Sequence, residues 1–251
     1  MGGTRGPYDR ESERAHVVTE LLSARLRRRV RTAGAEPLLT TYDTDAGARV
    51  ELSAVTLLNW VDKTSHLLDE LGVDPGDRVA LELAESAPGH WVTAVWELAC
   101  WQVGALVVVG EPAAARLLVT GPDWSRSAGA GADVVACSLH PLGLPLAEPP
   151  PPAVLDYALE VRGQPDRYPA VGQPPGAPAW QDPGRRLSQA DLVAGSPAPG
   201  RRLVRPGTPW ATAEAAVVAP LLSGGSAVVV TGTVSEHELD RIRRDERVNS
   251  G

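Results

Sequence analysis

The 251-residue sequence contains no phenylalanine, one methionine, two cysteines and a single lysine, Lys63. Because Lys63 follows Asp62, the Gly-Lys-Ser/Thr core of a P-loop cannot occur in this chain. A Schiff-base lysine or a phosphate-binding lysine would have to be Lys63 itself. Cys100 and Cys137 are too few for a disulfide framework or a tetrathiolate zinc site. These scarcities exclude P-loop NTPases, disulfide-rich secreted domains and zinc-finger modules.

Long apolar runs are also absent. No segment approaches the roughly 20 apolar residues that span a bilayer, and residues 1–16 are polar and charged, without the apolar region of a signal peptide. The formal net charge of −7 disfavours nucleic acid as a partner, because clustered cations are what bind the phosphate backbone. We therefore expect a cytoplasmic protein that binds neither membranes nor nucleic acid.

Arginine makes up all but one of the 24 lysine and arginine residues, a bias that GC-rich codons produce. Hydrophobic periodicity predicts an amphipathic helix over residues 11–31, ended by Gly34 and Pro37. Its last turns carry a basic cluster: Arg25, Arg27, Arg28, Arg29 and Arg31. Such a cluster indicates either a nucleic-acid or lipid patch or a solvated face that complements the helix C-terminus. The negative net charge favours the solvated face.

Residues 38–138 alternate between strand and helix patterns. Strands at 38–42 and 50–53 predict a hairpin, and Ser53 is placed to cap a helix that runs through Leu71. Residues 90–103 are the most informative segment. Their three tryptophans lie five residues apart and point in different directions on an almost wholly apolar helix, so we expect this helix to be enclosed. It joins predicted strands at 78–83 and 106–109 in a βαβ unit, and further strands are predicted at 117–120 and 133–138.

The composition changes over residues 141–183, which hold 12 of the 23 prolines, four of them consecutive at 149–152. This stretch is either a long surface crossover or a linker, with a short helix at 153–161. The closing quarter returns to α/β patterns. It predicts a strand at 202–204, a helix at 211–222 and a strand at 226–231, and a Ser235-x-x-Glu238 capping box opens a last helix.

These elements predict a single α/β domain over residues 1–251, with a mostly parallel sheet and helices on both faces. We divide it into a first lobe at 11–140, a proline-rich crossover at 141–183 and a closing α/β segment at 184–251. No internal repeat is present.

The sequence offers little catalytic chemistry. It has no G-x-S-x-G or G-x-G-x-x-G motif, and its five histidines lie far from one another along the chain. We therefore predict no catalytic residue, no metal site and no cofactor. His140 follows the strand at 133–138, where open α/β sheets bind ligands, although a histidine beside Pro141 is also typical of an ordinary loop.

Residues 71–80 read Leu-Gly-Val-Asp-Pro-Gly-Asp-Arg-Val-Ala. This run resembles the Leu-Gly-Val-x-x-Gly-Asp-Arg-Val-Ala entry to a core strand in the adenylate-forming (AMP-binding) superfamily of acyl-CoA synthetases, adenylation domains and luciferases. Gly104-Ala105 and the run Leu-Leu-Ser-Gly-Gly-Ser at 221–226 resemble later stretches of the same family. The resemblance implies the first half of an adenylate-forming N-terminal domain, in a short relative of actinobacterial type.

This sequence departs from the family pattern at the residues that carry out the family's chemistry. The resemblance places the family's Ser/Thr/Gly-rich phosphate loop, which ends in Pro-Lys-Gly, at residues 177–188, but these read Ala-Pro-Ala-Trp-Gln-Asp-Pro-Gly-Arg-Arg-Leu-Ser. One glycine remains, without the hydroxyl cluster or the lysine that would surround a triphosphate. The Tyr-Gly-x-Thr-Glu motif, the ribose-binding aspartate and the C-terminal domain with its catalytic lysine are also missing from this sequence. The candidates for lining a ligand pocket are Thr120, His140, Trp180, Gly184 and Arg185.

The leading hypothesis is a non-catalytic relative of AMP-dependent acyl-CoA synthetases that binds a partner protein or a small acyl or nucleotide-like ligand. The alternative is one component of an AMP-dependent acid–thiol ligase whose missing half comes from another polypeptide. A hydrolase or transferase working through His140 or Cys137 has no further support. We also expect a homodimer or a hetero-complex, because the apolar strand at 227–230 and the helix at 215–222 would otherwise lack cover.

Overall fold

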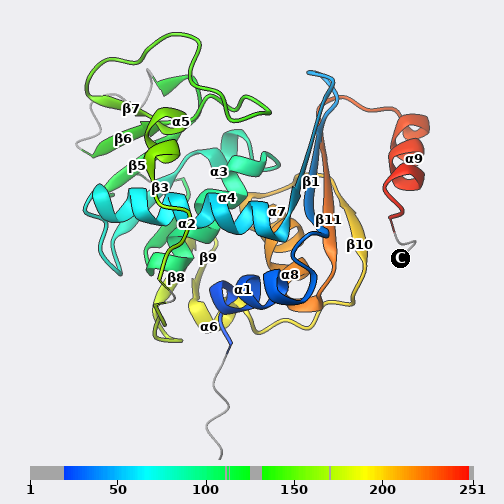
Figure 1. The fold of residues 1–251 in the computed structure, drawn as a ribbon, viewed down its shortest axis with the longest axis horizontal. Coiled ribbons are helices and arrows are strands. Elements are labelled where there is room, and N and C mark those ends of the chain that lie inside the picture. The colour runs from blue at the N-terminus through cyan, green and yellow to red at the C-terminus, as the bar shows by residue number, and fades with distance from the viewer. Residues whose placement is uncertain (1–19, 111, 113, 125–131, 170, 249–251) are drawn as a thin grey trace, which may run out of the picture.

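The computed structural model describes residues 20–110, 112, 114–124, 132–169 and 171–248. Its strands form two sheets with helices around and between them (Figure 1). The four-stranded sheet has the order β10 (Arg201–Val204), β11 (Ser226–Thr231), β1 (Pro37–Asp43), β2 (Ala48–Ser53). The seven-stranded sheet has the order β7 (Val154–Asp156), β6 (Asp133–Ala136), β5 (Leu117–Thr120), β3 (Arg78–Leu81), β4 (Leu106–Val108), β8 (Pro178–Asp182), β9 (Arg185–Ser188).

Parallel pairing dominates both sheets. The antiparallel pairs are the two hairpins, β1–β2 and β8–β9, and the remaining neighbours run parallel. The predicted α/β class is confirmed, and so are the predicted hairpin at the start and the parallel pairing of β3 with β4. The strands are nevertheless divided between two sheets, where the sequence had indicated one.

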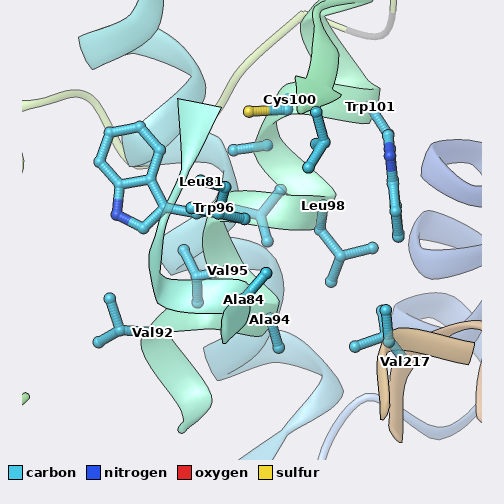
Figure 2. Packing of buried hydrophobic residues seen from close by; sticks show 14 of the residues in the cluster. Leu81, Ala84, Val92, Ala94, Val95, Trp96, Leu98, Cys100, Trp101 and Val217 are labelled. Atoms are coloured by element: carbon cyan, nitrogen blue, oxygen red, sulfur yellow. The ribbon is translucent and has the colours of Figure 1, made fainter. Parts of the chain in front are cut away.

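Helix α4 (Trp91–Val103) lies between these sheets, since it contacts β4 of one and β1 of the other. All 13 of its residues are buried, which confirms the enclosed helix expected from its apolar surface. Figure 2 shows Trp96 and Trp101 projecting from different sides of this helix into separate parts of the core. The helix ends at Gly104, whose φ of 85° is a left-handed conformation that glycine adopts without strain.

The remaining helices cover the sheets. Helix α2 (Ala54–Glu70) is capped by Ser53, as predicted, because the Ser53 hydroxyl accepts a hydrogen bond from the Thr56 N–H. This helix packs against α4. The helical elements are α1 (Leu22–Ala33), α2 (Ala54–Glu70), α3 (Leu83–Ser86), α5 (Tyr157–Glu160), η3 (Val161–Gly163), α6 (Gln189–Leu192), α7 (Pro209–Ala213), η4 (Glu214–Val218), α8 (Ala219–Ser223) and α9 (Glu236–Asp245). None of the described helices is long and apolar enough to span a membrane.

Several predicted boundaries are wrong. Helix α1 begins at Leu22, and residues 11–19 of the predicted helix lie outside the described residues. The strand predicted at 78–83 stops at Leu81, because the chain turns into the short helix α3. The helix predicted at 211–222 contains the π-helical turn η4, in which the Ala219 N–H donates to the Glu214 carbonyl. Pro220 explains this turn, since it lacks an N–H and its ring crowds the carbonyl four residues earlier.

The proline-rich stretch is part of the fold, as a crossover and not as a linker. The prolines at 149–152 lie just before the edge strand β7 in the sequence. The helix predicted at 153–161 is shorter than expected, because its first residues form β7 and only α5 and η3 follow as helical turns. Strand β8 then enters the interior of the sheet, where it pairs with β4 on one side and β9 on the other.

The expectation of an uncovered strand at 227–230 is wrong. Val228 and Val230 are fully buried beneath Leu239 and Ile242 of α9, and Figure 1 shows α9 outside the four-stranded sheet. The predicted helix at 215–222 is also covered, since Val217, Val218 and Leu221 are buried. The C-terminal helix therefore covers the strand for which we had expected a second subunit.

The basic cluster of α1 is largely paired within the chain. Arg28 and Arg29 form ion pairs with Glu20 and Glu36. Arg27 instead points inward, where its guanidinium lies 3.0 Å from the buried Asp62 carboxylate and also donates to Gln102 and to the Tyr168 carbonyl. Part of the predicted solvated face is therefore a structural contact that joins α1, α2 and α4.

Candidate functional site

A cleft of about 770 Å³ opens between the two sheets. Its walls are the loops that follow the carboxyl ends of β1, β10 and β11 in one sheet and of β3 and β6 in the other. Ligands of open α/β sheets bind outside the carboxyl ends of parallel strands. The position and size of this cleft therefore make it the candidate ligand site.

The β1–β2 turn forms one wall and is fixed by its own carboxylates. Asp43 Oδ1 accepts hydrogen bonds from the Asp45 and Ala46 N–H groups, at 3.1 and 3.0 Å. Asp45 Oδ1 accepts from the Thr233 N–H at 2.9 Å, which ties this turn to the loop after β11. Both side chains are exposed and line the cleft, so their charges act on its contents.

Arg205, just after β10, brings a cation to the same wall. Its Nη2 donates to the Gly232 carbonyl at 3.0 Å. Gly232 has a φ of 78°, and a Cβ at this position would lie 2.6 Å from Thr44 Oγ1 and 2.9 Å from Asp45 Cγ. Only glycine, which has no side chain, lets this backbone lie so close to Thr44 and Asp45. The Gly232 carbonyl therefore holds the Arg205 guanidinium beside the Asp45 turn.

His90 forms the opposite wall and caps α4. Its Nδ1 accepts from the Val92 N–H at 3.2 Å, and the ring also hydrogen-bonds to the Leu139 carbonyl. Burial lowers the His90 pKa to about 4, so the imidazole is neutral at neutral pH. Leu139 itself has a φ of 56°, in the left-handed region that residues other than glycine rarely adopt. His90 is therefore a positioning group whose ring nitrogens are already engaged.

The predicted pocket residues lie elsewhere. Thr120 is buried at the end of β5, where its carbonyl accepts from the Cys137 N–H. His140 is exposed, and its Nδ1 accepts from the Leu142 N–H. The neighbours of His140 in sequence, Leu139 and Pro141, do line the cleft, but His140 does not.

Trp180, Gly184 and Arg185 belong to the β8–β9 hairpin, away from the cleft lining. Trp180 is fully buried and packs edge-on against Trp210, with ring centroids 5.3 Å apart. The Arg185 guanidinium lies over the Trp210 ring and forms an ion pair with Asp182. The structure therefore gathers these three residues at one hairpin but places them in packing contacts, not in the candidate ligand site.

Sequence reasoning missed the groups that do line the cleft. Asp43 and Asp45 lie between the two strands of the predicted hairpin, and neither they nor Arg205 were among the predicted site residues. Their position in the sequence could have indicated these residues, because each follows the carboxyl end of a predicted strand. His140 was selected by that same rule.

Nucleophilic and metal chemistry find no support among the described residues. Cys100 and Cys137 are fully buried, and burial raises the pKa of both thiols above the usual range. His140 is exposed, so the hypothesis of a hydrolase working through His140 or Cys137 gains nothing from the structure. No group of three or more potential metal ligands occurs within the described ranges.

No family model matches the sequence. A TIGR03089 family protein from Mycobacterium tuberculosis is 41% identical over 133 residues, which make up 50% of this chain and 53% of that protein. The chain thus spans about half the length of the curated relative that it matches.

Two solved structures resemble the chain over most of its length. An acyl-CoA synthetase from Brucella canis matches with a TM-score of 0.68 and 17% identity, over 92% of this chain and 46% of that one. Acetoacetyl-CoA synthetase from Streptomyces lividans matches with a TM-score of 0.68 and 18% identity, over 91% of this chain and 41% of that one. The chain therefore has the fold of the N-terminal portion of adenylate-forming enzymes such as the acyl-CoA synthetases.

Proposed function

We propose that this protein is a non-catalytic relative of AMP-dependent acyl-CoA synthetases that binds a small ligand or a partner protein. The observation that carries this proposal is the hairpin at the place where the resemblance puts the family's phosphate loop. Only Pro183 and Gly184 separate β8 from β9. A two-residue turn offers no ring of backbone N–H groups around a triphosphate.

The polar groups of this hairpin are also engaged with one another. Asp182 accepts from the Trp180 indole N–H at 2.9 Å and from the Gly184 N–H at 2.8 Å. Its carboxylate also pairs with Arg185 at 3.3 Å. A carboxylate at the centre of the turn would repel the phosphates that a catalytic loop must hold. Both features support a role without carboxylate activation.

Ligand binding is supported separately by the cleft. Its volume of about 770 Å³ falls within the range of small-molecule sites, and its lining combines apolar residues with a few charged ones. A partner's loop could occupy the same space.

Two measurements test this proposal. Carboxylate-dependent exchange of labelled pyrophosphate into ATP should be absent for the isolated chain, and its appearance would overturn the non-catalytic assignment. A thermal-shift screen should find saturable stabilisation by at least one small-molecule class, because a ligand that binds only the folded state raises its stability. The screen should include ATP, AMP, CoA, acyl-adenylate mimics, amines and neutral compounds.

A matched pair of variants locates the binding. Ala46→Trp fills the cleft from the exposed β1–β2 turn and should abolish the stabilisation. Leu159→Trp adds the same ring on an exposed helix residue outside the cleft and should leave the stabilisation intact. Equal effects of the two variants would remove the cleft from the proposal.

The second candidate function is a ligase component completed by another polypeptide. The chain spans less than half of the Brucella canis acyl-CoA synthetase, which favours this possibility. Pyrophosphate exchange that appears only when a polypeptide carrying the Tyr-Gly-x-Thr-Glu motif is added would support this function over the first.

We further propose a single-domain, cytoplasmic protein that forms a homodimer or a hetero-complex. Free sheet edges support association, because β2 and β10 are the outer strands of the four-stranded sheet. Light scattering after size exclusion should give a mass above that of one chain, alone or with a partner. A monomer under both conditions would overturn the association.

A further inference from the structure

The charges around the cleft do not suit the polyphosphates that adenylate-forming enzymes handle. The described groups that line it include two carboxylates, Asp43 and Asp45, and one guanidinium, Arg205. Tyr42 and His90 also line the cleft, and both are neutral at neutral pH because burial raises the pKa of Tyr42 and lowers that of His90. The lining therefore carries one more negative than positive charge.

The cation of the lining, Arg205, lies beside the Asp45 turn. Arg205 is held on the Gly232 carbonyl, and Gly232 packs directly against Asp45. Arg205 and Asp45 thus both lie next to Gly232. Among the described residues no ion pair engages Asp43, whose carboxylate accepts hydrogen bonds from N–H groups of its own turn.

Asp43 lines the cleft and is exposed to solvent. Asp43 Oδ1 is occupied by two backbone N–H groups of its own turn. The carboxylate is therefore fixed in orientation and keeps lone pairs that can accept a hydrogen bond from a ligand donor.

The rest of the lining is mainly apolar. Ala48 and Val50 extend from the Asp43 turn, and Pro88, Leu139 and Pro206 face them from the other loops. An apolar body can remove this surface from water while a polar end reaches the carboxylate.

We propose that the cleft binds a small organic amine, with its ammonium group at Asp43 and its apolar body along the apolar lining. This inference rests on the proposed ligand-binding function and narrows it to one chemical class. Nucleotides and CoA, which carry several negative charges, are disfavoured by the same carboxylates.

The test uses three probes that differ only in the end group: pentylamine, 1-pentanol and pentanoate. Binding to the full chain is followed at neutral pH by NMR, through the amide signals of Ala46 and Gly232. We expect pentylamine to bind about fivefold more tightly than pentanol, since one exposed charge pair contributes up to about 1 kcal/mol. Pentanoate should bind more weakly than pentanol.

The Asp43→Asn variant tests the contribution of the Asp43 negative charge. The asparagine Oδ1 can still accept from the Asp45 and Ala46 N–H groups, so the turn should be preserved. This variant should lose the preference for pentylamine over pentanol while keeping its pentanol affinity. Asp240→Asn removes a charge from exposed α9, outside the cleft, and should keep the preference.

The outcomes separate the two proposals. If pentanoate binds best, or if Asp43→Asn keeps the amine preference, the amine assignment is wrong while the binding function stands. If neither these probes nor any compound of the thermal-shift screen binds, the ligand-binding function itself is overturned.

Discussion

The indole N–H of Trp180 donates to the carboxylate of Asp182, two residues further along β8, at 2.9 Å. Trp180 is fully buried, so this bond satisfies a polar group that water cannot reach. The same carboxylate accepts from the Gly184 N–H, which closes the turn into β9. One aspartate thus couples the core to the hairpin at which the sequence resemblance places the family's phosphate loop.

Asp182→Ala should destabilise the protein by about 1–3 kcal/mol, because it leaves a buried indole N–H without a partner. Urea unfolding followed by tryptophan fluorescence measures the loss. Asp133→Ala, which removes an exposed carboxylate paired with Arg116, should cost under about 1 kcal/mol. Equal losses for the two variants would contradict the role assigned to Asp182.

Trp96→Ala should cost about 3–5 kcal/mol, since it removes a fully buried ring from the enclosed helix α4. Figure 2 shows this ring among neighbours such as Leu81 and Val95. Trp96→Phe keeps much of the apolar volume and should lose clearly less. Denaturant midpoints of both variants check the order, and a loss below about 1 kcal/mol for the alanine variant would be incompatible with the observed burial.

Glu97 should make the free energy of unfolding decrease as the pH rises. Burial raises its pKa from the usual 4.5 to about 8, so the folded chain holds a proton that the unfolded chain releases above pH 4.5. The stabilisation linked to this proton is complete below pH 4.5 and is lost as the pH rises to about 8.

Glu97→Gln removes the titrating group and should flatten the stability profile over that pH window. Urea midpoints at several values between pH 4.5 and 8 provide the comparison with the wild-type chain. An unchanged slope in the variant would show that Glu97 does not set this dependence.

Glu246 fixes the end of α9 to the four-stranded sheet. Its buried carboxylate accepts from Tyr42 at 2.6 Å and from Arg49 at 2.8 Å, and it also pairs with Arg201. Glu246→Gln should loosen α9, because the charged carboxylate that pairs with Arg49 and Arg201 is replaced by a neutral amide.

Hydrogen exchange of the α9 amides should then become at least about tenfold faster, which corresponds to roughly 1.4 kcal/mol. Glu238→Gln serves as the control, since Glu238 makes only a partly exposed pair with Arg241 on the same helix. If both variants exchange alike, the Glu246 contacts do not hold α9.

Local features of the sequence determined much of this protein. The hairpin, the Ser53 cap and the strand at 117–120 follow from side-chain periodicity and from hydrogen bonds between near neighbours, which the chain carries wherever it folds. The enclosed helix follows from its almost continuous apolar surface. The absence of a lysine and of a hydroxyl cluster at residues 177–188 was readable too, because folding cannot supply missing side chains.

Tertiary structure decided which strands pair and what the paired strands bring together. Strand β1 pairs with β11, so that Leu39 lies opposite Ala227, and no local pattern encodes a contact over that distance along the chain. The same pairing sets Asp43 and Asp45 beside the loop after β11 and divides the strands into two sheets. The cleft and its charges therefore depend on non-local parallel pairing, whereas single residues and their immediate neighbours specify the elements themselves.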